Sequence, residues 1–417
     1  MAHSDVAASP ARPTSAPTPA PAASMRAFAA SPLADYYLTV LSVAILSVLG
    51  ILMVLSASSV LATAQGDSPY YYTIRHLAFL VVGVTLAVAI TRIPPDVMRR
   101  FGWVAWGAAL VALLLVLSPL GHEYQGNQNW INIGPVRFQP SEFAKLALIV
   151  WAASLYHGRR GKLHEPFQLL VPFIPGAAVL LWLILAGKDL GTGMVVGLVI
   201  VSLMFFVGTP FRLLLPLIAG AAGLVGLLVA GSPSRFSRIL VFLDPQSNTD
   251  LSSQPMAALY ALASGGWWGL GLGASKQKWG GLKNAAHTDF IFAVIGEELG
   301  LFGVLVVLAM FALLAKAGLS VALKSDKIFN RIAAAGITAW FLIQALINIG
   351  VVMHLLPVLG VPLPFISSGG SALLSNLIAV GVLLSIARDT PDARRHLAKR
   401  RRRRQPRMTS VLAAGSK

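Results

Sequence analysis

The chain contains ten separate runs of apolar residues, each long enough to cross the hydrocarbon core of a membrane as a helix. Charged residues make up 12% of the 417 residues, whereas a soluble protein carries about a quarter. Because only lipid tolerates so much apolar surface, the sequence predicts an all-α integral membrane protein with ten transmembrane helices. The predicted spans are residues 36–60, 75–92, 101–119, 141–157, 167–186, 190–208, 211–231, 290–318, 330–355 and 366–387.

Basic residues between the spans predict the orientation. They gather in the loops after spans two, four, six and eight and beyond span ten, which is typical of the cytoplasmic side. Both termini are therefore expected in the cytoplasm. Residues 1–34, rich in Ala, Ser and Pro, are expected to be a disordered cytoplasmic tail and not a signal peptide. The membrane domain then covers 35–387, and a basic cytoplasmic tail covers 388–417.

The formal net charge of +17 is strongest in that basic tail. Basic residues directly after a span act as a topogenic signal and attract anionic lipid headgroups, so lipid and not nucleic acid is the expected partner. The chain has no cysteine, which excludes disulfides, thiolate metal sites and cysteine nucleophiles.

The connection between spans seven and eight, about residues 232–289, is much longer than the others on the outer side. It carries Arg235, Arg238, Lys276, Lys278 and Lys283 against the cytoplasmic bias of basic residues. Its middle, residues 265–273, combines glycines with two tryptophans, which favours an interfacial segment with glycine bends. A long loop without strong secondary structure is usually functional or disordered, and we favour function here.

Several ionisable residues lie in or beside the spans, where lipid disfavours charge. Glu142 and Lys145 are three residues apart, so they share a helix face and can pair, as a structural brace or in a functional site. Asp189 precedes span six and is suited to cap it. Glu297 and Glu298 are adjacent, about 100° apart on a helix, so we expect them to have separate partners and to brace helices.

Asp289 lies where the long outer loop enters span eight, at the boundary between membrane and water. A carboxylate there can stay ionised below five cations and reach a substrate at headgroup level; the alternative is a helix cap. Residues 357–371 combine prolines and glycines at membrane depth, which indicates a broken or re-entrant backbone or a simple turn.

The order and sidedness of these motifs resemble the SEDS family (shape, elongation, division, sporulation) over about residues 36–387. The motifs are Phe138–Lys145, Asp189–Thr192, Arg238 with Phe242–Pro245, His287–Gly300, and Asn348–Ser371. The segment Gly296–Gly300 is more similar to the division members than to the elongation members. Asn129 and Lys188 depart from the family, which usually has Arg and Pro there.

The resemblance implies a ten-span peptidoglycan glycosyltransferase that polymerises lipid II, with Asp289 as the general base that takes the proton of the acceptor sugar hydroxyl. Cations are then needed for the lipid pyrophosphate leaving group. No ligand cluster specific for a metal stands out, and a divalent cation, Mg or Mn, would also serve that group. The candidate substrate-binding residues are Arg75, Arg137, Gln139, Glu142, Lys145, Arg238, Lys276, Lys278, His287 and Ser368.

The resemblance further implies a multi-pass protein of a bacterial plasma membrane, at the division septum, with a class B penicillin-binding protein transpeptidase and other division proteins as partners. Three alternatives stay open. The chain is a lipid II flippase, a polymerase of cell elongation, or a scaffold whose partner does the chemistry. Against a flippase, the two halves lack the matching broken helices that are typical of transporters.

Overall fold

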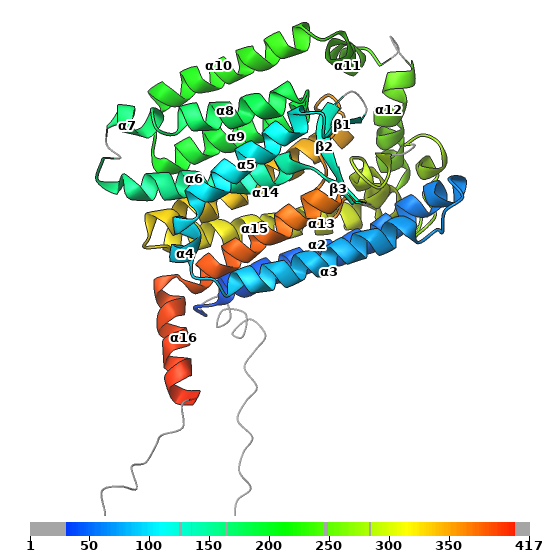
Figure 1. The fold of residues 1–417 in the computed structure, drawn as a ribbon. Coiled ribbons are helices and arrows are strands. Elements are labelled where there is room, and N and C mark those ends of the chain that lie inside the picture. The colour runs from blue at the N-terminus through cyan, green and yellow to red at the C-terminus, as the bar shows by residue number, and fades with distance from the viewer. Residues whose placement is uncertain are drawn as a thin grey trace, which may run out of the picture.

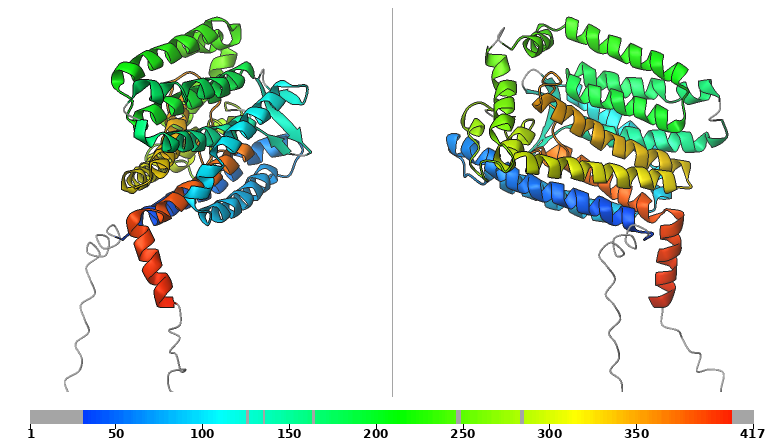
Figure 2. Two further views of the ribbon diagram at one scale, coloured as in Figure 1. Left: turned by 60° about the vertical axis from the view of Figure 1, so that its left-hand side comes forward. Right: turned by 180° about the vertical axis from the view of Figure 1, so that it is seen from behind.

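In the computed structural model the long helices lie side by side with their axes roughly aligned (Figures 1 and 2). Disorder was predicted for residues 1–34, of which 1–30 lie outside the residues that the structure describes, whereas Ala34 already begins a helix. The last part of the basic tail and Lys283 also lie outside the described residues. The described residues are 31–124, 127–134, 136–162, 165–245, 249–282 and 285–404.

Each predicted span is helical, so the predicted helical membrane fold is confirmed. Eight described segments are long and apolar enough to cross a membrane; the other two predicted spans are α5, with 16 residues, and α6, which begins with a charged pair. The long helices are α2 (Ala34–Ala64), α3 (Tyr71–Thr91), α5 (Gly102–Leu117), α6 (Pro140–Gly158), α8 (Ile174–Ala186, preceded by the short α7, Pro166–Leu170), α9 (Leu190–Val207), α10 (Phe211–Ala230), α13 (Ile291–Lys324), α14 (Ile328–Val352) and α15 (Gly370–Arg388).

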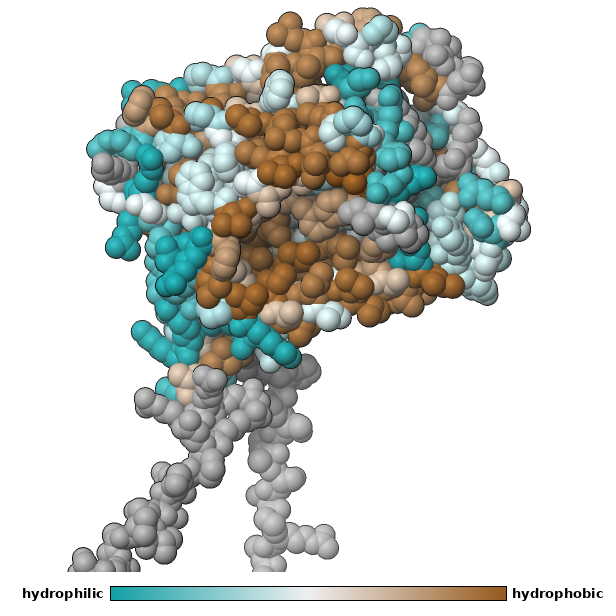
Figure 3. Space-filling model, in the orientation of Figure 1, coloured by the Kyte–Doolittle hydropathy of each residue, from teal (hydrophilic) through white to brown (hydrophobic). Residues whose placement is uncertain are grey.

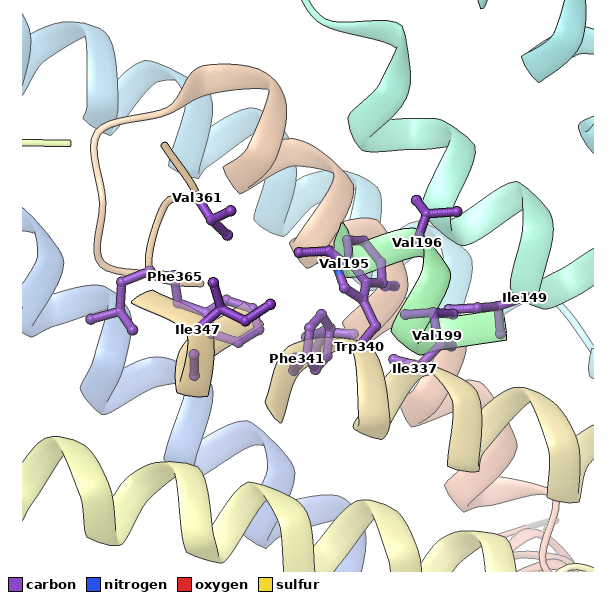
Figure 4. Close-up of a cluster of buried hydrophobic side chains, with 14 of the residues drawn as sticks. Ile149, Val195, Val196, Val199, Ile337, Trp340, Phe341, Ile347, Val361 and Phe365 are labelled. Atoms are coloured by element: carbon purple, nitrogen blue, oxygen red, sulfur yellow. The ribbon is translucent and has the colours of Figure 1, made fainter. Parts of the chain in front are cut away.

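The centre of the bundle is formed by α14 and α15. The buried share of the most apolar stretch is 78% in α14 and 83% in α15, whereas it is 11% in α10. A helix that is apolar all round is suited to such a buried position. Figure 4 shows part of this core, where Val195 and Val199 of α9 meet Trp340 of α14, while α10 lies at the rim of the bundle.

The two ends of the bundle differ. One end, here called the sheet end, carries a three-stranded antiparallel sheet and two further helices. The other, the tail end, carries three short elements, and both described termini leave from it (Figure 1). The sheet end consists of β1 (Gly121–Tyr124), β2 (Asn127–Ile133), β3 (Val136–Phe138), α11 (Pro233–Leu243) and α12 (Thr249–Ser264); the tail end has α4 (Pro95–Arg100), α7 and α16 (Pro391–Arg404).

Two features of the sheet end differ from the sequence prediction. The sheet lies between α5 and α6, where no strand was predicted, and the long connection is partly helical. Two of the three strands have only three or four residues, and α12 contains Pro255, so these elements give little periodic signal in the sequence.

Ion pairs hold the tail end together. The Nζ atom of Lys327 lies 2.7 Å from Oδ2 of Asp96 and 3.0 Å from Oδ2 of Asp389, so it links α4 to the ends of α14 and α15. The side chain of Arg394 in α16 pairs with Asp326. The described basic residues that were predicted to face the cytoplasm thus lie at the same end as both termini.

Apolar residues cover much of the surface between the two ends. On the face drawn in Figure 3, a broad apolar area is flanked by polar residues on both sides. This is the pattern expected for a protein whose sides contact lipid and whose ends contact water.

Candidate active site

Asp289 lies at the sheet end, two residues before α13 begins. The N-cap residue of α13 is Phe290, which makes no side-chain capping bond. Asp289 is half-buried, and among the described residues its carboxylate has no hydrogen bond or ion pair. The carboxylate is therefore available to a reactant.

A loop formed by residues 353–369 holds the backbone around Asp289. The Nδ2 atom of Asn348 donates to the carbonyl oxygen of Asp289 at 2.7 Å and to that of Val361 at 2.8 Å. The Oγ atom of Ser367 donates to the carbonyl oxygen of Thr288 at 2.7 Å. Residues 353–369 contain no helix or strand, so the predicted irregular backbone between spans nine and ten is confirmed.

Two opposing effects set the pKa of Asp289. Burial raises it to about 6, and the positive charge of Arg238 in α11 acts in the opposite direction. Gly360 of the loop lies beside the carboxylate, because a Cβ at this position would be 3.8 Å from Oδ2 of Asp289. A carboxyl group with a pKa near 6 is mostly ionised at neutral pH and is still basic enough to accept a proton efficiently.

His287 and Ser368, two of the predicted site residues, are joined directly. The main-chain N–H of Ser368 donates to the carbonyl oxygen of His287 at 2.9 Å. The ring of Tyr72 from α3 packs on the buried ring of His287, with centroids 4.8 Å apart, and burial lowers the pKa of His287 to about 4. At neutral pH this histidine is uncharged.

Arg75, Arg137 and Gln139 lie around the first residues of α15. The main-chain N–H of Gln139 donates at 3.0 Å to Oγ of Ser371, and that hydroxyl donates at 3.5 Å to the carbonyl oxygen of Arg137. Arg75 lies over the ring of Phe79, which packs against the first residue of α15. The first N–H groups of a helix lack intrahelical partners and carry positive partial charge, so this region favours an anion.

Glu142 and Lys145 form the predicted pair, fully inside the bundle. Their charged atoms are 2.9 Å apart, and both side chains are at most 3% exposed. Lys145 also donates to Oε1 of Gln344 at 2.9 Å and lies over the ring of Trp340. Because Gln344 in turn donates to the carbonyl oxygen of Pro362 at 2.9 Å, the pair supports the loop from below.

Glu297 and Glu298 both accept hydrogen bonds from Ser275, so the prediction of separate partners holds only in part. Glu298 alone also accepts from Ser56 of α2, at 2.6 Å. The Oγ atom of Ser275 donates to Glu297, and the N–H of Ser275 donates to Glu298 at 3.2 Å. The segment that contains Ser275 wraps around α13, so its successive groups reach carboxylates that point about 100° apart. Lys278 is buried and 3.0 Å from Glu298, whereas Lys276 is exposed and donates only its main-chain N–H, to Glu297.

The glycine-rich segment Gly265–Gly273 packs against a break in α13. Gly300 interrupts the helix with φ 64° and ψ −162°, and the N–H of Leu301 beyond it donates to the carbonyl oxygen of Gly266 at 2.9 Å. A Cβ on Gly300 would lie 2.4 Å from the main-chain nitrogen of Gly269, so glycine is required by this close approach. Both tryptophans of the segment are exposed, as expected for an interfacial position.

Asp189 caps α9, as its position before span six indicated. Its Oδ1 accepts from the N–H of Thr192 at 3.0 Å, and its Oδ2 accepts from Nδ2 of Asn129 at 2.9 Å and from Nε2 of Gln139 at 3.2 Å. Asn129, which departs from the family pattern, therefore joins the sheet to α9. The side chain of Gln139, the residue before α6, joins the start of α6 to α9 through the same carboxylate.

An apolar groove of about 570 Å³ opens near the sheet and runs toward α4. Figure 3 shows the hollow between α3 and α5. Its residues come from α3, α4, α5, α6 and α15, and Phe138 at its sheet end is next to Arg137. The groove is wide enough and apolar enough to hold a lipid chain.

Among the described residues, no group of three or more His, Asp or Glu side chains could hold a metal ion. The carboxylates of Glu297 and Glu298 are taken by N–H, hydroxyl and ammonium donors, which a cation would have to displace. We therefore assign no residue to a metal.

The sequence analysis placed Asn348 at the start of a family motif, but it did not predict the contact of Asn348 with Asp289 and did not single out Gln344. Asn348 and Gln344 lie one turn apart on the same face of α14 and donate to the carbonyl oxygens of two adjacent loop residues, Val361 and Pro362. Polar side chains within an apolar span were the signal that could have identified them.

The fold and site together define a multi-span membrane protein with an accessible carboxylate at one end of the bundle. The profile of a family described as "Cell cycle protein", named for FtsW, RodA and SpoVE, matches residues 36–392. The chain therefore belongs to this family, the SEDS family.

Relatives and solved structures agree with this membership. A protein of Trichlorobacter lovleyi named "Probable peptidoglycan glycosyltransferase FtsW" is 38% identical, and the alignment covers 85% of this chain and 94% of that protein. A protein of the same name from Mycobacterium tuberculosis is 36% identical, with 87% and 69% covered.

Two solved structures have the same fold. The first, described as "Structural coordination of polymerization and crosslinking by a peptidoglycan synthase complex", gives a TM-score of 0.70 at 28% identity and covers 84% of this chain and 97% of its own. The rod shape determining protein RodA of Thermus thermophilus gives 0.63 at 26% identity, with 85% and 96% covered.

Proposed function

We propose that the chain is a peptidoglycan glycosyltransferase that polymerises lipid II, with Asp289 as the general base. The observation that carries the proposal is the carboxylate of Asp289: half-buried, without a hydrogen bond or ion pair among the described residues, and in the field of Arg238. Relatives named as peptidoglycan glycosyltransferases support the reaction type.

In the proposed reaction, an Oδ atom of Asp289 accepts the proton of a sugar hydroxyl on the acceptor lipid. The oxygen of that sugar hydroxyl forms a bond to the anomeric carbon of the donor sugar, and the bond from this carbon to the pyrophosphate oxygen breaks. The electron pair leaves with the lipid pyrophosphate, and attack from the opposite side inverts the anomeric centre.

The developing charge on the pyrophosphate requires positive groups that are in place before the reaction. Arg75 and Arg137 beside the first turn of α15 supply such groups, and Arg238 supplies another next to Asp289. His287 and Ser368 join these two regions. Lys276 is exposed near this end, whereas we leave Lys278, Glu142 and Lys145 as supports, because they are buried in ion pairs.

The lipid chain of the substrate is proposed to lie in the groove that begins at Phe138. A chain in the groove would place its pyrophosphate near Arg137 and the first turn of α15. The sugar beyond the pyrophosphate would then extend toward Asp289.

For the orientation, we propose that the sheet end faces outward and the tail end faces the cytoplasm, as the positive-inside rule requires. The septum is the proposed location, because the similar proteins carry the name FtsW. A class B penicillin-binding protein is the proposed partner, in keeping with the synthase complex of similar fold. Other division proteins and anionic lipids are proposed to contact the tail 388–417.

The test is glycan synthesis by the purified protein in vesicles with lipid II on the outer leaflet. Asp289→Asn is expected to abolish polymer formation, and Asp67→Asn, which changes an exposed acid at the same end, is expected to leave it intact. Polymer from the Asp289 variant would remove Asp289 from the role. Movement of labelled lipid II without polymer would instead favour the flippase.

A further inference from the structure

α11 presents a stripe of large apolar side chains that no other described part of the chain covers. Phe236, Leu240 and Leu243 are 47%, 46% and 72% exposed, and their spacing of four and three residues places them on one face of the helix. At about 100° per residue, Arg238 lies nearly opposite this stripe, close to the buried Val241.

The helix also crosses the direction of the spans. In Figure 1, α11 is seen almost end-on while the long helices lie across the view, and it appears end-on again from behind (Figure 2). It follows α10, whose outward side chains Leu215, Ile218, Leu224 and Leu227 are exposed along the bundle. α11 therefore directly follows the candidate span that is least buried in the structure.

We propose that α11 is an interfacial helix whose stripe of Phe236, Leu240 and Leu243 inserts into the outer leaflet, and that this restricts the movement of Arg238 relative to the site. The proposal rests on the proposed outward orientation and on the proposed roles of Arg238 and Asp289. An amphipathic helix parallel to the membrane plane, with aromatic and leucine side chains on one face and arginines on the others, is suited to this position.

The contacts of α11 explain why lipid would matter to the site. Arg235 donates to the carbonyl oxygens of Lys188 at 3.0 Å and Leu228 at 3.3 Å, and the ring of Phe242 packs on His354. These contacts attach α11 to the rest of the protein near the first and the last turn of the helix. Insertion of the opposite face would hold the helix from its other side and restrict the movement of Arg238.

The depth of α11 can be measured directly, because the chain contains no cysteine. A fluorophore is attached to Leu240→Cys and, as a matched control on the opposite face, to Ser234→Cys, in the full chain in phospholipid nanodiscs. We expect nitroxide-labelled lipid to quench the label at position 240 and aqueous iodide to quench the label at position 234. Equal quenching of both by iodide overturns the proposal.

A partner protein is the competing occupant of the stripe. If the label at position 240 is accessible to iodide in nanodiscs and becomes shielded only when a second protein is added, the stripe is a protein interface and the lipid proposal is wrong.

The effect on the site is tested separately by polymerisation. Leu240→Ser with Leu243→Ser is expected to lower kcat about tenfold to a hundredfold, since a displacement of about 1 Å in a site can cost that factor. Leu323→Ser, an exposed leucine at the tail end, is the control and should keep the full rate. If quenching of the Leu240→Cys label shows that the stripe lies in lipid but the double serine variant keeps the full rate, the link to Arg238 is wrong. The quenching result does not depend on activity, so it stands even if Asp289→Asn shows the proposed function to be wrong.

Discussion

The side-chain nitrogen of Asn348 lies 2.7 Å from the carbonyl oxygen of Asp289 and 2.8 Å from that of Val361. One amide group in α14 thus joins the chain before α13 to the loop before α15. The carboxylate of Asp289 itself takes no part in this contact. Its backbone is fixed while its side chain stays available.

Asn348→Ala is expected to lower kcat more than it raises KM, because Asp289 would lose its position while the substrate-binding groups remain. The loss of two buried hydrogen bonds should also cost about 1–3 kcal/mol of stability. Asn330→Ala is the matched control, since Asn330 is a buried asparagine that bonds Asp389 at the tail end. If both variants lost only stability and kept kcat, Asn348 would have no positioning role.

The rate of polymerisation should depend on the protonation of Asp289. The base must be ionised, so the rate should rise with pH, reach half its maximum near the pKa of about 6, and level off above it. Arg238 lowers this pKa, so Arg238→Gln should move the midpoint of the pH profile to higher pH. Arg238→Lys keeps the charge and should leave the midpoint nearly unchanged; a shift of the same size in both variants would exclude a charge effect.

Asp289→Asn should be more stable than the natural protein at neutral pH. The pKa of Asp289 in the folded protein, about 6, lies above the ordinary value of 3.8 for an aspartate, so the folded state binds the proton more tightly than the unfolded state. The natural protein therefore loses stability as pH rises from about 4 to about 6, and the variant does not. Thermal unfolding at pH 4 and pH 7.5 tests this: the difference in Tm should be larger at pH 7.5.

Most helices of the bundle could be predicted from the sequence, because a span of about 20 apolar residues is a strong and local signal. For Asp289 the local sequence left a helix cap and a functional acid open, and only the resemblance to the family favoured the role of a base. The sheet and the positions of Asn348 and Gln344 relative to the loop were not predicted. Those features depend on contacts between residues far apart in the chain, as between Asn348 and Asp289, which no local pattern contains.

The same limit applies to the two adjacent glutamates. Their geometry on an ideal helix correctly predicts that they point in different directions, but the segment that reaches both follows a path set by Gly300 and the glycines facing it. The wrapped segment could not be inferred from the helix alone.

Lys145→Met is expected to destabilise the protein by about 3–5 kcal/mol, because it leaves the carboxylate of Glu142 buried without its cation. The double variant Glu142→Gln with Lys145→Met removes both charges and should recover most of that loss. Thermal unfolding in detergent measures both. A double variant as unstable as the single one would show that the pair contributes more than mutual neutralisation.

The glycine-rich segment requires glycine for two reasons, its positive φ angles and its close approach to α13, and two alanine variants can distinguish them. Gly269 and Gly271 both have positive φ, 79° and 99°, so alanine at either position should cost about 1–2 kcal/mol in backbone strain. A Cβ at Gly269 would lie 2.1 Å from the carbonyl oxygen of Glu298, whereas a Cβ at Gly271 would meet nothing within 4 Å. Gly269→Ala should therefore lower the Tm clearly more than Gly271→Ala.

Quenching of tryptophan fluorescence gives a second measurement. Because the N–H groups of the glycine-rich segment pair with the carbonyl oxygens of Glu297 and Glu298, only Gly269→Ala should expose the tryptophans of the segment further to an aqueous quencher. Equal effects of the two variants would mean that the segment can move away from α13 at little cost.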